Sequence, residues 1–89
     1  MEAPVNNVLD AIPAEHRAVI IDELARLEPA MLTELRATKE PSSEQTRAVV
    51  DVLITEMMNN LGPDWRPNER GLAIEKAIGA YYSAWPTNE

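Results

Sequence analysis

The chain has 89 residues, of which eight are Lys or Arg and fifteen are Asp or Glu, so its formal net charge is −7. This acidic balance opposes binding to nucleic acids, which depends on clustered bases that neutralise phosphates, and binding to anionic membrane surfaces. The sequence contains no cysteine, which excludes disulfides, thiolate zinc sites and a cysteine nucleophile.

The length fits one domain, and 45% hydrophobic residues without a single Phe predict an aliphatic core. We therefore expect one domain over 1–89, with frayed ends at 1–4 and 86–89. No apolar run approaches the roughly 18 residues of a membrane span, and the start "MEAPVNNVLD" lacks the features of a secretory signal. These observations favour a cytoplasmic protein without a membrane partner.

Prolines punctuate the first half of the chain at intervals that match helix lengths. The stretch "VNNVLDAI" predicts a short helical turn whose apolar residues form a small flap, and these are Val5, Val8, Leu9 and Ile12. A helix is expected from Pro13, because proline is tolerated in the first turn of a helix but not in its interior. Apolar spacing continues through Pro29, where the chain either kinks or restarts as a new helix, and a restart is favoured.

The clearest helix start lies at Ser42, since a serine followed three residues later by Gln45 fits a capping box. The helix that follows, over 43–60, has apolar residues on more than the roughly 100° arc of an ordinary surface helix. It should therefore be central, or central and also part of an interface. Gly62 is expected at the C′ position of this helix, and Pro63 prevents its continuation.

The last predicted helix begins at 67 or 68 and ends at 84, and it carries two neighbouring stripes. One stripe is large (Ile74, Ile78, Tyr81 and Trp85), and the other is small (Ala73, Ala77, Ala80 and Ala84). Small side chains permit the close approach of another helix, and we predict self-association through Ala73, Ala77, Ile78, Tyr81 and Trp85. With no period-2 alternation to suggest strands, the fold class is all-α, a small single-domain helical bundle of four to five helices.

Between the last two helices lies "GPDWRPNERG", residues 62–71. Turn chemistry explains most of it, with Asp64 in an Asx-turn and Trp65 folded inward as a lid over the core. Turn chemistry does not explain why Arg66 and Arg70 flank a tryptophan, and Trp and Arg are enriched at binding hot spots. The sequence thus leaves two interpretations, a connector with a structural lid or a partner-binding loop of Trp65, Arg66 and Arg70. Arg70 has its own alternative, an ion pair with an acid of its own chain.

No residue pattern indicates chemistry. His16 is the only histidine, and no paired-histidine zinc motif, calcium loop or phosphate-binding glycine motif is present. We expect no enzyme activity, no catalytic residues, no metal and no cofactor. An enzyme or small-ligand site built on Tyr81, Tyr82 and Trp85 is the least favoured alternative.

By elimination, the sequence predicts a non-enzymatic protein-protein interaction or regulatory module that forms a possible homodimer through its last two helices. Its protein partner cannot be identified from the sequence, and no nucleic acid partner is expected. The alternative is an acidic inhibitor, similar to immunity proteins or antitoxins, that occupies a basic site on a toxin or a nucleic-acid enzyme.

Overall fold

The computed structural model describes residues 7–86. They form a 3-10 turn, η1 (Val8–Ala11), and four helices, α1 (Ala14–Leu27), α2 (Pro29–Arg36), α3 (Ser43–Met58) and α4 (Glu69–Ala84). No strand occurs within 7–86, so the prediction of a small all-α bundle is confirmed. The ends predicted to fray, 1–4 and 86–89, lie outside the described residues except for Pro86.

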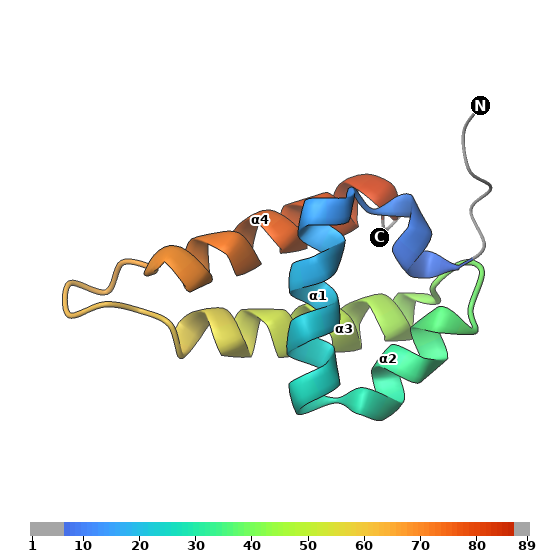
Figure 1. Ribbon diagram of the computed structural model, residues 1–89, viewed down its shortest axis with the longest axis horizontal. Helices are drawn as coiled ribbons and strands as arrows, with labels where there is room; N and C mark the ends of the chain where they lie inside the picture. The colour runs from blue at the N-terminus through green and yellow to red at the C-terminus, as the bar shows by residue number, and fades with distance from the viewer. Residues whose placement is uncertain (1–6, 87–89) are drawn as a thin grey trace.

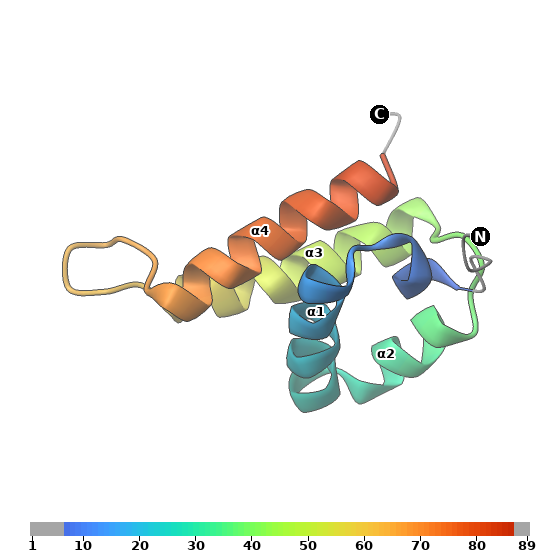
Figure 2. The same cartoon turned by 45° about the horizontal axis from the view of Figure 1, so that its top comes forward.

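Helices α3 and α4 form a long antiparallel hairpin, and the loop between them projects from one end of the molecule (Figure 1). They remain side by side when the view is tilted (Figure 2). Helix α1 crosses one face of this hairpin and contacts both of its helices, while α2 contacts α1 and η1. The hairpin therefore has one face covered by α1, called here the front face, and one opposite face, called the rear face.

The predicted helix starts follow from local chemistry. The chain restarts as a new helix at Pro29, which occupies the first turn of α2, as the sequence favoured. At the start of α3 the Ser42 hydroxyl accepts from the Gln45 N–H at 3.1 Å, and the Ser42 N–H donates to the Gln45 side chain at 2.9 Å. The predicted capping box is thus confirmed.

The 3-10 turn η1 covers the end of the core that lies farthest from the loop between α3 and α4. The side-chain oxygen of Asn7 caps η1, and the backbone of Val8 bonds to the carbonyl of Thr38 at 2.9 Å. The indole N–H of Trp85 donates to the Val8 carbonyl at 2.9 Å. Val8, Leu9 and Ile12 are buried, which confirms the predicted apolar flap for these three; Val5 lies outside the described residues.

The end of α3 differs from the prediction. The helix ends at Met58 with Asn59 as its cap, so the expectation that Gly62 occupies the C′ position is wrong. The reason is that the chain turns into a ribbon instead: Leu61 pairs with Pro67 in an isolated bridge, and the Gly62 N–H donates to the Arg66 carbonyl at 2.6 Å. Gly62 is used in this ribbon and has no left-handed backbone angle.

Candidate interaction surface

A buried carboxylate, that of Glu23 on α1, lies between α1 and the front face of the hairpin. Glu23 is only 1% exposed, and its Oε1 accepts a hydrogen bond from Arg70 Nε at 2.8 Å and forms an ion pair with Arg70 Nη2 at 2.7 Å. Its Oε2 pairs with Arg26, which also reaches Glu56 Oε1 on α3 at 3.0 Å. These four residues, the Glu23 cluster, tie α1 to both helices of the hairpin.

The charges in the Glu23 cluster are matched, which is what a buried carboxylate requires. Burial of the Glu56 carboxylate opposes its ionisation, but the hydrogen bond and positive charge of Arg26, together with hydrogen bonds from Asn59 and Asn60, outweigh this effect, so the pKa of Glu56 is lowered. Of the two alternatives for Arg70, the structure shows the ion pair with an acid of its own chain: Glu23 is its close partner at 2.7 Å, and Asp22 is a second, looser partner at 3.9 Å. Arg70 therefore belongs to the front face, and the loop presents Trp65 and Arg66 alone.

The loop between the two hairpin helices is a short hydrogen-bonded ribbon, called here the arm (residues 59–68). The Asn68 N–H donates to the Asn60 carbonyl at 2.8 Å, and the Trp65 N–H donates to the Gly62 carbonyl at 3.0 Å. Asp64 Oδ1 accepts from the Arg66 N–H at 3.4 Å, as expected for an Asx-turn. The arm thus has a defined shape rather than that of an open loop.

Trp65 lies at the tip of the arm and is unusual in both its backbone conformation and its exposure. Its φ is 64°, and within residues 7–86 no other non-glycine residue has a positive φ. Its surface is 82% exposed, so the predicted inward lid is wrong. The physical reason is that the ribbon holds the tip beyond the ends of both helices, where no core surface is within reach of the indole. A bulky residue in a left-handed conformation costs free energy, and such conformations concentrate at functional positions.

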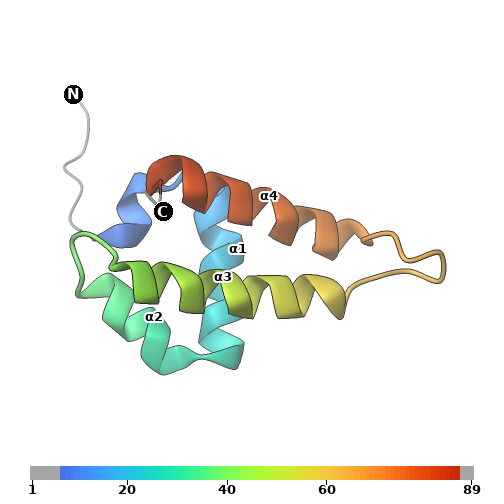
Figure 3. The ribbon, with the colours of Figure 1, turned by 180° about the vertical axis from the view of Figure 1, so that it is seen from behind.

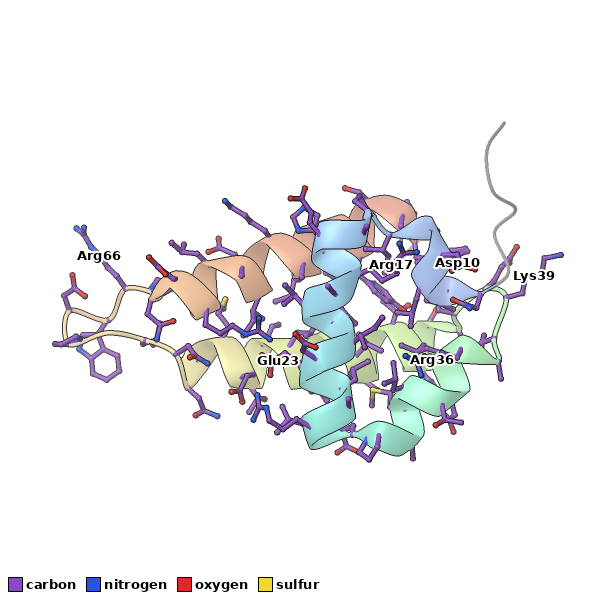
Figure 4. All side chains as sticks on the ribbon, in the orientation of Figure 1. Asp10, Arg17, Glu23, Arg36, Lys39 and Arg66 are labelled. Atoms are coloured by element: carbon purple, nitrogen blue, oxygen red, sulfur yellow. The ribbon has the colours of Figure 1, made fainter. Side chains whose placement is uncertain are left out.

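Arg66 lies beside Trp65 and is 85% exposed, with only a loose 3.6 Å contact to Asp64. Figure 4 shows it pointing away from the molecule, whereas Glu23 lies where α1 crosses the hairpin. The arm therefore ends in an exposed aromatic ring and an exposed guanidinium, two groups that bind partners well.

The base of the arm is fixed by Gly71 in the first turn of α4. A Cβ at this position would lie 2.9 Å from the Cβ of Pro67 and 3.0 Å from the carbonyl oxygen of Asn60. The side chain of Asn68 caps α4 by accepting from the Gly71 N–H at 2.9 Å. The close approach that glycine permits therefore sets the direction in which the arm leaves the bundle.

The rear face carries apolar side chains that nothing covers within the described chain. Viewed from behind, α3 and α4 lie in front and α1 passes beyond them (Figure 3). Of the six large apolar side chains that are exposed among residues 7–86, five belong to α3, the arm or α4. They are Ile54, Met58, Trp65, Leu72 and Tyr82.

A hollow of about 180 Å³ lies on this rear face, between the start of α3 and the end of α4. Its lining comes from those two helices only: Ser43, Thr46, Arg47, Val50, Asp51, Ile54 and Tyr82. Met58 lies one turn after Ile54, and Gly79 lies one turn before Tyr82, so both extend the same face toward the arm. A Cβ on Gly79 would meet no atom within 4 Å, which leaves an open strip along α4.

The residues predicted for self-association are placed differently from these. Ala77 and Tyr81 have no exposed surface, and Tyr81 meets Thr46 inside the core at 3.5 Å. Ile78 and Trp85 pack against the core, and Ala73 lies with His16 and Val19 of α1 along a surface groove. The stripe identified in the sequence is therefore the side of α4 that meets its own chain.

The exposed apolar side chains of the last two helices lie on another face, and three of them, Ile54, Met58 and Leu72, were not selected as site residues from the sequence. The sequence contained part of the information needed to predict these exposed residues, because α3 has more apolar positions than one face of a helix needs. Ile54 and Met58 are that surplus. Which side of each helix α1 would cover was not readable from periodicity alone.

No family model, no curated protein and no solved structure matches this chain. Among residues 7–86 no three His, Asp or Glu side chains gather in a way that could hold a metal ion. None of the described helices combines the length and the apolar character that crossing a membrane requires.

Proposed function

We propose that this protein is a non-enzymatic protein-protein interaction or regulatory module whose binding surface consists of the arm and the rear face of α3 and α4. One observation carries the proposal: five of the six exposed large apolar side chains among residues 7–86 lie on this one hairpin. Large exposed apolar side chains that gather on one part of a domain mark interaction sites more often than side chains scattered singly over the surface.

The arm supports the same proposal. Trp65 has a φ of 64° and is 82% exposed, so its indole adds little to the stability of its own core. A partner that buries it would gain a large apolar contact with little ordering cost, because the hydrogen-bonded ribbon has already fixed the tip. Trp65 is therefore the expected hot spot, with Arg66 as its polar neighbour.

The second candidate is the acidic inhibitor, which is favoured by the net charge of −7. In that case the partner is basic, and the acidic surface steers the encounter. The two candidates differ in their response to salt. An apolar contact centred on Trp65 loses little affinity as salt rises, whereas charge-driven binding to a basic target is strongly weakened.

The test is capture from native cell extract with the immobilised full chain at two salt concentrations. The Trp65→Ala variant should lose the captured protein, and the matched control is Leu27→Ala, because Leu27 is the one exposed large apolar residue outside the hairpin among residues 7–86. Retention that survives high salt and depends on Trp65 supports the proposal. Equal capture by both variants, or no capture at all, contradicts it, and capture lost with salt alone supports the inhibitor.

A further inference from the structure

A groove separate from the rear face lies where the start of α1 crosses the second half of α4, and it is called here the α1–α4 groove (Figure 1). Its volume is about 520 Å³, and small-molecule sites usually measure about 300–1,000 Å³. Apolar atoms make up most of its lining, and four of its residues are small and apolar: Ala11, Pro13, Ala80 and Ala84. The groove can therefore take up an apolar group of modest size.

The charged lining of the α1–α4 groove is basic, although the chain as a whole is acidic. The net charge of the chain is −7, yet no Asp or Glu lines this groove. His16 and Lys76 line it instead, and Ser83 adds a hydroxyl. Lys76 forms no ion pair with any of residues 7–86. An ammonium without a partner beside an apolar surface is complementary to an anion.

His16 supplies a second hydrogen-bond donor from the opposite helix. Its Nε2 lies 3.5 Å from Oε1 of Glu15, which is a loose contact with a side chain that is 81% exposed. An imidazole has two ring nitrogens and donates from at least one of them in either protonation state. Because His16 lies on α1 and Lys76 on α4, an anion that both residues contact bridges the two helices.

The surroundings of these two residues orient a ligand. His16 and Lys76 also line an adjoining hollow of about 230 Å³, which extends toward the start of α4 and includes Glu15 and Glu69. These carboxylates repel an anion, and an apolar group that covered them would displace their water at a cost in free energy. The apolar part of a ligand should therefore extend in the other direction, toward Ala84.

We propose that the α1–α4 groove binds a small organic anion with an apolar chain, of the class of medium-chain carboxylates. The carboxylate pairs with Lys76 and accepts a hydrogen bond from His16, while the hydrocarbon chain lies over Ala80 and Ala84. From Lys76 to Ala84 the helix rises about 12 Å, at about 1.5 Å per residue, which suits a chain of medium length. This inference goes beyond the proposed function, because neither the arm nor the rear face takes part in the binding.

NMR titration of the full chain with octanoate tests this site. Octanoate should bind with a dissociation constant of about 1 mM or below, and it should shift the amide signals of His16, Lys76 and Ala84. Two matched probes separate the contributions of charge and chain: octylamine has the same hydrocarbon chain with the opposite charge, and acetate has the carboxylate without the chain. Both should bind at least about tenfold more weakly than octanoate.

The two lysines of the chain, Lys39 and Lys76, provide matched variants. Lys76→Glu places a like charge beside the bound carboxylate, so octanoate binding should weaken at least about tenfold. Lys39→Glu makes the same change in net charge outside the groove, at a side chain that points away from the bundle in Figure 4, and it should leave binding unchanged. Both positions are exposed, and circular dichroism establishes that both variants are folded.

Four results would overturn the site: a dissociation constant for octanoate far above about 1 mM, octylamine or acetate binding as tightly as octanoate, a Lys76→Glu variant that binds octanoate no more weakly than the Lys39→Glu variant, or amide shifts that centre on the rear face. Trp65 and Arg66 do not line this groove. Octanoate binding and the capture of a protein partner are therefore measured independently, and either one can fail without the other.

Discussion

The front and rear faces of the α3–α4 hairpin are built from the same two helices, yet they differ in what their side chains contact. On the front face, Glu23 of α1 is enclosed with Arg70, and Ala77 allows α1 to pack closely. On the rear face, Ile54 and Tyr82 are exposed beside an open hollow. Apolar residues on both sides of a helix pair are therefore not all buried in the core of their own chain. Of two neighbouring apolar positions on one helix, one can be buried and the other exposed.

The largest expected difference lies between Leu53 and Ile54, which are adjacent on α3. Leu53 has no exposed surface, whereas Ile54 is 41% exposed. Leu53→Ala should lower the free energy of unfolding by about 2–5 kcal/mol through the cavity it leaves. Ile54→Ala, measured by urea denaturation at a low protein concentration, should change it by no more than about 0.5 kcal/mol. Equal losses at the two positions would show that the rear face is part of the core.

The next largest difference in stability is expected between variants of Arg66 and Arg70, the two arginines that flank Trp65. Arg70→Ala deprives the buried Glu23 carboxylate of a charge-assisted hydrogen bond and an ion pair, and the free energy of unfolding should fall by about 1.5–3 kcal/mol. Arg66→Ala removes only an exposed side chain, so its melting temperature should match that of wild type. Thermal unfolding of both variants decides the matter, and a large loss at Arg66 would mean that the arm is structural after all.

The glycines of α4 form a third matched pair. Gly71→Ala drives a methyl group against Pro67 and the Asn60 backbone, and this should cost about 1 kcal/mol or more. Gly79→Ala meets open space inside a helix, so it should stabilise the monomer by about 0.4–1 kcal/mol. Denaturation midpoints that move in opposite directions support the assignment, and destabilisation by both changes would contradict it.

The smallest effect concerns alkaline pH and the neighbours Tyr81 and Tyr82. Burial raises the pKa of Tyr81, and its hydrogen bond with Thr46 offsets this only in part. In the unfolded chain a tyrosine ionises near about pH 10. Above that pH the unfolded state releases a proton that the folded state retains, so stability is complete below it and falls as pH rises.

Tyr81→Phe should therefore flatten the loss of stability above about pH 10, measured by urea denaturation at several pH values. Tyr82→Phe is the control, because Tyr82 is an exposed member of the rear face and its loss should leave the alkaline slope in place. If only the Tyr82 variant flattened the slope, the burial of Tyr81 would be the wrong explanation.

Local chemistry made most of the fold predictable. The capping box at Ser42 and the restart at Pro29 depend on residues within one turn, and both were readable from spacing. The partner of Arg70 lies 47 positions away, so only the tertiary fold brings Glu23 to it. The covered side of α4 depends on how α1 crosses the hairpin, and the exposed indole of Trp65 depends on the ribbon that holds the tip of the arm beyond the helices. No local pattern encodes either feature.

The proposed binding role of the rear face and arm is tested most directly by the two indole N–H signals in NMR spectra of the full chain as the captured partner is added. The Trp65 signal should shift on addition of the partner, together with the amides of Ile54 and Tyr82. The Trp85 signal, whose proton is held by the Val8 carbonyl, should stay in place. A Trp65 signal that stays in place when the partner is saturating, or shifts confined to Trp85 and α1, would contradict the account.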